Sequence, residues 1–279
     1  MKKVLLVLMC FLTTVGLQKA TAIEADASIS NKIRYHIAQT YNSIDFSKVD
    51  SLSYIVFAKA YYGYINLYNE GMLNAQKHML TICDFTLSAN TKRMWVIDLE
   101  KKKVVLNTHV SHGQASGKEY AQVFSNKTGS HKSSIGFYIT AETYSGKHGY
   151  SLRLFGMDKG FNSAAYNRDI VVHGASYVST EFIRGNQCLG RSWGCPAVSN
   201  ELSEELINTI KDNTCLYIHF PEARYLKSSL WLNKPITELP QFNPLDFALQ
   251  HRDTVIKYNY GREMKRIIKY VNRFHFPLF

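Results

Sequence analysis

The N-terminal third of the chain shows apolar residues at helical spacing. The stripe runs at intervals of three and four through Phe57, Ala60, Tyr61, Tyr64, Ile65 and Tyr68, which places its members on one face of a helix. Ser51 or Ser53 would cap the start of this helix, and the helical pattern extends from Asn31 to about Met79. Aromatic residues at this spacing usually mark a buried face. We therefore interpret the stripe as packing and not as a carbohydrate platform.

From Met94 onward the hydrophobic period changes to two, which is typical of β-strands. Residues 94–99 and 104–110 flank a polar turn at 101–103 and predict a β-hairpin. Further strands are predicted over residues 136–141, 151–155, 170–173 and 215–220.

One clear helix is predicted between the last two strands. Ser199 or Asn200 caps it, and the acidic residues Glu201, Glu204 and Glu205 suit the positive end of its dipole. Its inner face consists of Leu202, Leu206, Ile207 and Ile210. The whole pattern predicts a mostly-β domain with an embedded helix.

Polar and proline-rich segments connect and follow these elements. Residues 111–134 and 156–168 are too long for simple turns, so they either shape a cleft or form solvated loops. Pro235, Pro240 and Pro244 indicate a linker wrapped on a surface. A helix is expected from about Arg262, apolar on one side and basic elsewhere. Such a helix either docks on its own domain or lies on an anionic membrane or polymer surface.

The first residues have the pattern of a secretory signal peptide. Two lysines precede the apolar run 4–16, and Ala20-Thr21-Ala22 follows as a cleavage site, so the mature chain is expected to begin near Ile23. Export would place the protein in the periplasm or cell envelope. The net charge of +11 falls to +8 because the segment carries three lysines and no acid. A basic exported protein suits anionic envelope polymers, whereas nucleic acid is excluded as a partner by export and by the absence of a recognition motif.

Candidate chemistry centres on Ser192-Trp193-Gly194-Cys195, with His173-Gly174 upstream. A neighbouring imidazole converts a thiol to the nucleophilic thiolate, and we expect such a pair to react quickly with alkylating agents at mild pH. Gly194 permits a tight turn whose backbone N–H groups face a developing oxyanion. One imidazole nitrogen of His173 is expected within or slightly beyond hydrogen-bond reach of the Cys195 sulfur. Four cysteines remain after cleavage, namely Cys83, Cys188, Cys195 and Cys215, and this even number is also typical of a disulfide framework.

The sequences Ile-Val-Val-His-Gly-Ala at 170–175 and Leu-Gly-Arg-Ser-Trp-Gly-Cys-Pro-Ala-Val at 189–198 resemble the murein L,D-transpeptidase family, the YkuD-like enzymes. The resemblance is to the branch with a Ser-Trp-Gly-Cys-Pro motif, and it extends from about Ala58 to about Phe220. Trp193 stands where most members have a second histidine, and Pro196-Ala197 replaces residues that usually bring an arginine. Arg191 is our first choice as a substitute that binds a peptide carboxylate, followed by Arg184 and Arg153.

The resemblance implies a β-sandwich or barrel that carries an embedded helix, with an N-terminal helical segment and a C-terminal helical extension. The corresponding divisions are a signal peptide at 1–22, a helical segment packed on the catalytic domain at 23–90, the catalytic domain at 91–222 and a basic extension at 223–279.

The resemblance also implies an enzyme that acts on peptidoglycan stem peptides without metal or cofactor. Cys195 would attack the carbonyl before the D-residue, form a thioester and pass the acyl group to an amine, with His173 as the base. Ser192 and Gly194 would shape the catalytic turn, while Gly174, Trp193 and Arg191 would contact substrate. The alternatives are an L,D-carboxypeptidase that uses water as acceptor, and a peptidoglycan-binding module that has lost catalysis.

A metal site at His109 and His112 is a weaker hypothesis. Their spacing is H-x-x-H, but no third ligand is nearby in the sequence.

Overall fold

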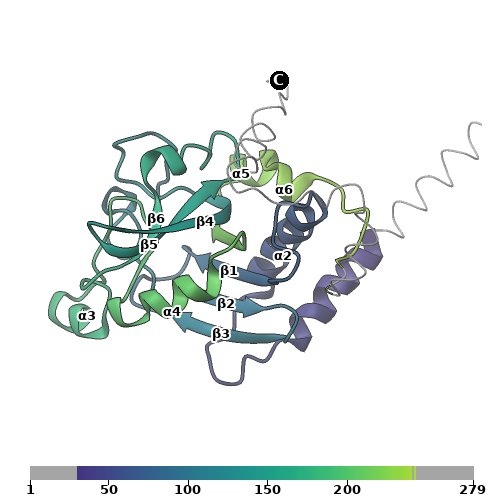
Figure 1. Ribbon diagram of the computed structural model, residues 1–279, viewed down its shortest axis with the longest axis horizontal. Helices are drawn as coiled ribbons and strands as arrows, with labels where there is room; N and C mark the ends of the chain where they lie inside the picture. Colours follow the sequence, from purple (N-terminus) through teal and green to yellow (C-terminus); the bar gives the residue numbers. More distant parts are fainter. Residues whose placement is uncertain (1–29, 241, 243–279) are drawn as a thin grey trace, which may run out of the picture.

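The computed structural model describes residues 30–240 and residue 242 (Figure 1). The predicted signal peptide and the predicted basic helix from Arg262 lie outside these residues. Expectations about both therefore stay predictions.

The fold is mostly β and is built on one sheet of eight strands in the order β3-β2-β1-β8-β4-β5-β6-β7. The strands are β1 (Met79–Asp84), β2 (Met94–Asp98), β3 (Lys103–Thr108), β4 (Gly136–Gly146), β5 (Gly149–Gly156), β6 (Val171–Gly174), β7 (Ala197–Val198) and β8 (Cys215–His219). The predicted hairpin and the four further predicted strands are confirmed. The pattern of apolar and polar residues did not predict β1 or the two-residue β7.

The strand that was missed, β1, lies in the interior of the sheet, between β2 and β8. It pairs antiparallel with β2 and parallel with β8, where Leu80 is opposite Cys215 and Asp84 is opposite His219. Five of its six residues are buried. Because both faces are covered, the strand lacks the alternation of apolar and polar residues that reveals a half-exposed strand.

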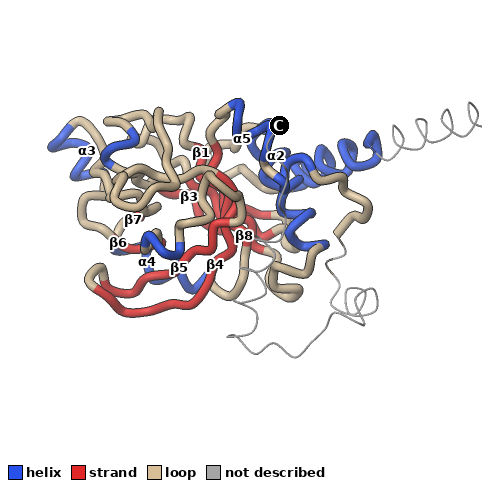
Figure 2. Tube along the Cα trace, turned by 90° about the horizontal axis from the view of Figure 1, so that it is seen from above, coloured by secondary structure: helices blue, strands red, loops and turns tan. Residues whose placement is uncertain are grey.

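The sheet curls so that its two ends approach each other (Figure 2). The segment that follows β3 runs beside β7: the Ser111 N–H donates to the Ala197 carbonyl at 2.8 Å, and Gly113 forms a bridge with Ser192. The sequence around Cys195 therefore lies where the ends of the sheet meet.

Helices cover the sheet. Residues 30–43 are helical, α2 (Tyr54–Asn69) contacts β1 and β8, and α4 (Asn200–Ile210) contacts β5 and β6. The predicted aromatic stripe of α2 is buried, which confirms its role in packing. Ser53 is the N-cap of α2 and Ser199 the N-cap of α4, although neither side chain makes a capping hydrogen bond. A short helix that was not predicted, α3 (Thr180–Asn186), precedes the motif.

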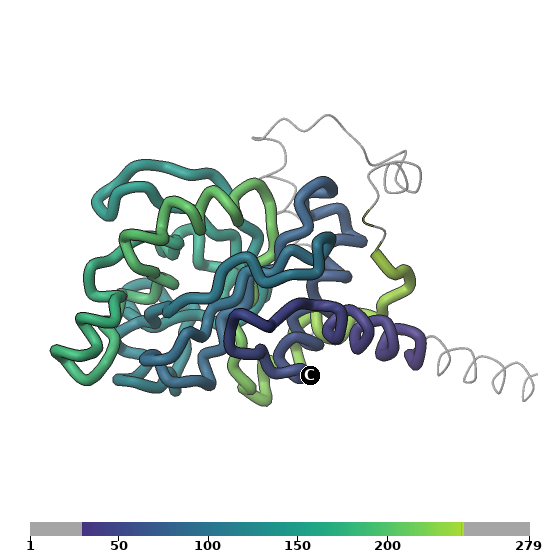
Figure 3. The backbone as a smooth tube through the Cα atoms, turned by 90° about the horizontal axis from the view of Figure 1, so that it is seen from below, coloured from purple at the N-terminus to yellow at the C-terminus, as the bar shows by residue number. Residues whose placement is uncertain are grey.

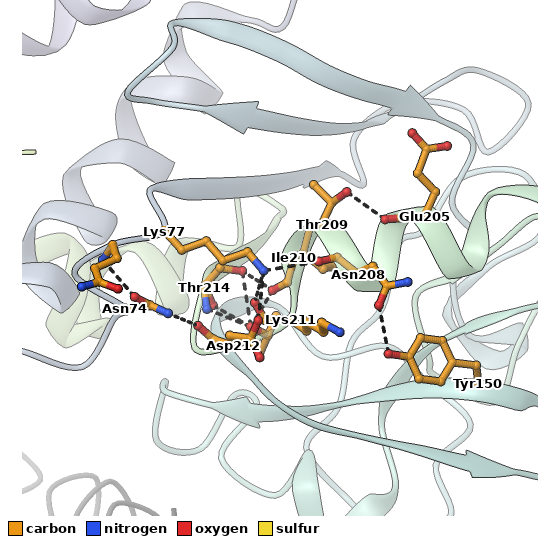
Figure 4. Close-up of polar contacts among 12 residues, drawn as sticks. Asn74, Lys77, Tyr150, Glu205, Asn208, Thr209, Ile210, Lys211, Asp212 and Thr214 are labelled. Carbon is orange, nitrogen blue, oxygen red and sulfur yellow. Dashed lines mark hydrogen bonds and ion pairs between the residues drawn. The ribbon is translucent and has the colours of Figure 1, made fainter. Parts of the chain in front are cut away.

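The C-terminal end of α4 is held by the segment between α2 and β1 (Figure 4). Lys77 Nζ donates to the carbonyls of Asn208 and Lys211 at 3.3 and 2.8 Å and pairs with Asp212 at 3.2 Å. A cation at this position balances the negative end of the helix dipole. Asn74 adds a contact from its side-chain amide to the Asp212 carbonyl.

The residues after β8 form a strap that includes α5 (Ala223–Ser228) and α6 (Leu230–Asn233). Asn66 of α2 donates to the Trp231 carbonyl at 2.9 Å, so the strap packs on the N-terminal helices at one end of the molecule (Figure 3). Buried Asp158 joins the strap to β4, because it accepts hydrogen bonds from the Phe137 N–H, the Ser229 hydroxyl and the Tyr225 hydroxyl.

Candidate active site

The turn that precedes β7 is fixed by Ser192. Its hydroxyl donates to the Cys195 carbonyl at 2.6 Å and accepts from the Gly194 N–H at 3.1 Å. Gly194 has φ +125°, and a Cβ there would lie 2.8 Å from the Lys132 carbonyl oxygen. Both the backbone angle and the space therefore require glycine at this position.

Cys195 is half-buried and its sulfur is free, as are the sulfurs of Cys83, Cys188 and Cys215. The thiol donates to the Asp169 carbonyl across 3.6 Å. Burial raises the pKa of the Cys195 thiol to about 11, while the Arg168 guanidinium opposes this shift. This raised pKa favours the protonated thiol at neutral pH, so the thiolate expected from the sequence stays a prediction.

His173 lies buried on β6. Its Nδ1 lies 2.8 Å from the Gly174 carbonyl oxygen, which requires the proton on Nδ1 and leaves Nε2 as the basic nitrogen. Burial lowers the pKa of His173. The neutral imidazole is thus favoured, and it is the form that accepts a proton.

The pairing of β6 with β7 brings the two side chains to one edge of the sheet. His173 is opposite Ala197 in the parallel ladder, so Cys195, two residues earlier, lies near the start of β6. In this conformation the thiol and Nδ1 hydrogen bond to the Asp169 and Gly174 carbonyls and not to each other.

Two of the predicted substrate contacts differ in their surroundings. A Cβ on Gly174 would lie 2.8 Å from Asn200 Oδ1 and from Ser203 Oγ, so this glycine allows α4 to pack closely on β6. Trp193 is 68% exposed and stacks on His131, with ring centroids 4.7 Å apart and planes at 11°. Its indole therefore stands at the surface beside the turn that carries Cys195.

The three candidate arginines are placed very differently. Arg153 pairs with Glu142 at 3.4 Å and with Asp169 at 2.9 Å, so its charge is already balanced. Arg184 is exposed in the last turn of α3. Arg191 donates to the carbonyls of Gln114 and Gly117 and, together with Lys118, lines a cavity of about 420 Å³.

Sequence reasoning missed Arg168, whose charge acts on the Cys195 thiol. Its guanidinium donates to the Ser125 and Lys132 carbonyls at 2.7 and 2.9 Å and to the Ser134 hydroxyl at 2.5 Å. These acceptors come from the polar segment 111–134, which composition alone could not place beside β6. A basic residue just before a predicted strand was the one signal available.

The histidines of the H-x-x-H sequence are engaged elsewhere. His112 contacts Arg93 Nη2 at 2.7 Å, and burial lowers the pKa of His112 to about 4. His109 contacts the Asn90 carbonyl. Within residues 30–240 no group of three side chains is arranged to hold a metal ion, and none of the helices described there is long and apolar enough to cross a membrane.

A family model described as the L,D-transpeptidase catalytic domain matches residues 48–219. The comparison with curated protein sequences gives no significant match. Among solved structures, similarity is found to an L,D-transpeptidase from Mycobacterium smegmatis (12% identity, TM-score 0.33, 51% of this chain and 59% of that one). A second is the K307A mutant of the helical cell shape determining protein Pgp2 from Campylobacter jejuni (13% identity, TM-score 0.33, 76% and 77%). This chain therefore covers less than two thirds of the length of the mycobacterial enzyme.

Proposed function

Because the chain belongs to the L,D-transpeptidase catalytic domain family, we propose that it is an exported peptidoglycan L,D-transpeptidase with Cys195 as nucleophile. The observation that carries the proposal is the placement of Cys195 on a glycine-dependent turn, at the sheet edge that also presents the basic Nε2 of His173. Stem peptides are the substrate class, and no cofactor enters the chemistry.

The reaction begins with a neutral thiol and a neutral imidazole. His173 Nε2 takes the proton as Sγ attacks the carbonyl carbon before the D-residue, and the new C–S bond gives a tetrahedral oxyanion. Collapse breaks the amide bond, leaves a thioester on Cys195, and releases D-alanine with the proton from His173. An amine of a second stem then attacks the thioester carbon, and His173 accepts the amine proton as the new amide bond forms. The C–S bond breaks, and His173 returns the proton to Sγ, which regenerates the thiol.

The Cys195 N–H is the proposed oxyanion donor. The neighbouring Gly194 N–H is hydrogen-bonded to Ser192 Oγ and would need to release this bond before it could act as a second donor. Ser192 therefore acts mainly by holding the turn.

The cavity beside the turn is the proposed site for a substrate carboxylate. Lys118 and Arg191 contribute two positive charges to it, and no acidic side chain lines it. Neither cation forms an ion pair with another described residue. Arg191 and the exposed Trp193 would then contact the peptide on the same side of Cys195.

Product analysis tests the reaction. The mature protein, from about Ile23, is incubated with muropeptide tetrapeptides, and products are identified by mass spectrometry. Cross-linked dimers are expected, because an oriented amine outcompetes water through its effective concentration. Tripeptides without cross-linked dimers would contradict the proposal and show an L,D-carboxypeptidase that uses water as acceptor. Unchanged substrate that still binds would favour the inactive binding module, for which the raised thiol pKa is the motivating observation.

Substitutions test the residue roles in the same assay. Cys195→Ala and His173→Ala are each expected to abolish D-alanine release, and Ser192→Ala to weaken it less, because the nucleophile and its base act as a unit. His109→Ala and Cys83→Ala are the matched controls and should retain turnover. Activity in the Cys195 variant would refute the assignment.

The carboxylate site has its own test. Arg191→Gln and Lys118→Gln should raise KM for tetrapeptides that carry free carboxylates, with little change in kcat. The loss should disappear for a peptide in which the recognised carboxylate is amidated. Arg184→Gln is the control on the neighbouring helix, and equal losses for acid and amide peptides would remove the cavity from the site.

A further inference from the structure

The β4–β5 hairpin contacts the surroundings of both Cys195 and His173. Its strands pair from Tyr138–Gly156 to Gly146–Gly149, and the hairpin extends beside α4 and β6 (Figure 2). Next to the turn, β5 pairs with β6 so that Ser151 is opposite His173. The end of the hairpin is thus fixed in register with the proposed base.

His148, at the tip of the hairpin, stacks on His173. The ring centroids are 4.4 Å apart and the planes lie at 27°. His148 is exposed, whereas His173 is buried. An exposed aromatic ring therefore covers one face of the imidazole and restricts its rotation.

The tip is anchored immediately beyond His148. Gly149 has φ +71°, which favours glycine at the tight turn. The Tyr150 hydroxyl then donates to Asn208 Oδ1 of α4 at 3.1 Å (Figure 4). These two features fix the backbone on which the His148 ring is carried.

Arg153 of β5 contacts Asp169, the residue whose carbonyl accepts a hydrogen bond from the Cys195 thiol. Arg153 of β5 lies over the rings of Tyr144 and Tyr166, 4.6 and 5.2 Å from their centroids, and donates to Asp169 Oδ1 at 2.9 Å. Asp169 has φ 53°, an unusual angle for a residue with a side chain. Its carbonyl accepts a hydrogen bond from the Cys195 thiol.

We infer that the β4–β5 hairpin is the positioning element of the active site, and that His148 is a positioning residue that holds the His173 imidazole with Nε2 available to the thiol. The inference rests on the proposed function of His173 as base. The hydrogen bond to the Gly174 carbonyl fixes the position of Nδ1, and the stacked His148 ring fixes the plane of the His173 imidazole. Small misplacements of a catalytic group reduce rates strongly, so this contact should affect kcat more than KM.

The charge of His148 supplies a second readout. Among described titratable groups, His148 is the one whose charge acts on His173, and it lowers the pKa of the imidazole. The residues of α4 that lie beside the adjacent Gly174, Asn200 and Ser203, are neutral. Phenylalanine at position 148 would keep the stacked ring and remove the charge.

The test compares His148→Ala, His148→Phe and the tip control Lys147→Ala for D-alanine release across pH. We expect His148→Ala to lower kcat about 10- to 100-fold with KM nearly unchanged, and His148→Phe to restore kcat to within about threefold of the original. The acid limb of kcat/KM should move to higher pH in His148→Phe, because the uncharged neighbour lets His173 hold its proton to higher pH. Lys147→Ala should leave all three quantities unchanged.

Unchanged kcat in His148→Ala, or equal losses in the Ala and Phe variants with unaltered melting temperatures, would overturn the inference. An NMR titration of the His173 ring provides a readout that does not depend on turnover. The pKa of His173 should rise in His148→Phe, and an unchanged pKa would also overturn it. Absence of turnover in the unmodified protein would instead refute the proposed function, while the titration would still test the contact.

Discussion

The protonation states of two side chains define the resting site. Burial raises the pKa of the Cys195 thiol to about 11 and lowers that of His173, so neither carries charge at neutral pH. The Cys195 thiol donates a hydrogen bond to the Asp169 carbonyl. In the proposed reaction, charge would therefore separate only when a substrate supplies a carbonyl to attack.

Alkylation of the thiol measures this directly. The rate with iodoacetamide should rise about tenfold per pH unit between pH 7 and pH 10, because it follows the thiolate fraction of a thiol whose pKa lies near 11. Cys83, Cys188 and Cys215 are buried and should react slowly, which Cys195→Ala checks as the control. A rate that is already maximal at pH 7 would show a preformed ion pair.

At the scale of elements, α2 packs closely against the sheet at Gly63, where the helix has no side chain. A Cβ on Gly63 would lie 2.0 Å from Phe137 Cζ, and both residues are buried. The Phe137 ring, from β4, therefore occupies the space that another residue at position 63 would fill.

Gly63→Ala should destabilise the protein by about 1–3 kcal/mol through overpacking, although alanine normally favours a helix over glycine by about 1 kcal/mol. The free energy of unfolding in urea measures the change. Gly185→Ala in α3 is the matched control, because nothing lies within 4 Å of the added Cβ. A stabilised Gly63 variant would contradict this packing, and Phe137→Leu should partly rescue it.

The elements with a clear period were predictable, and the contacts between them were not. The alternation at 94–110 predicted the hairpin of β2 and β3, and the stripe of α2 predicted its buried face. β1 has no alternation because both its faces are covered. The motif identified Cys195 and His173 as candidates. His148 and Arg168 reach the site from a hairpin tip and from a 3-10 helix (Tyr166–Arg168), and the positions of both depend on tertiary packing.

At the scale of the whole molecule, Asp158 links the C-terminal strap to the sheet. Burial raises the pKa of Asp158 to about 6, although hydrogen bonds from Ser229, Phe137 and Tyr225 oppose the shift. The folded state thus binds a proton more tightly than the unfolded chain does. The stability gained from this proton is complete below about pH 4 and is lost as the pH rises through 6.

Asp158→Asn should remove this dependence. The unfolding free energy of the original protein, relative to the variant, should fall by about 2 kcal/mol between pH 4 and pH 7, since each pKa unit corresponds to about 1.4 kcal/mol and the unfolded carboxyl is itself partly protonated at pH 4. Urea unfolding of both proteins at each pH measures the difference, and the comparison cancels the contributions of other carboxylates. A difference that does not vary with pH would show that Asp158 titrates as an ordinary carboxyl.

The parallel pairing of β1 with β8 constrains the order in which the chain can assemble. Leu80 and Cys215 are neighbours in the sheet although they lie 135 positions apart in the sequence, and Cys195 lies within the loop that this pair closes. A growing chain therefore exposes the unpaired edges of β1 and β4 until residues 215–219 have been synthesised. Long-range closure of this kind is slow. The sheet that carries His173 and lies beside Cys195 is consequently complete only after residues 215–219 have been added.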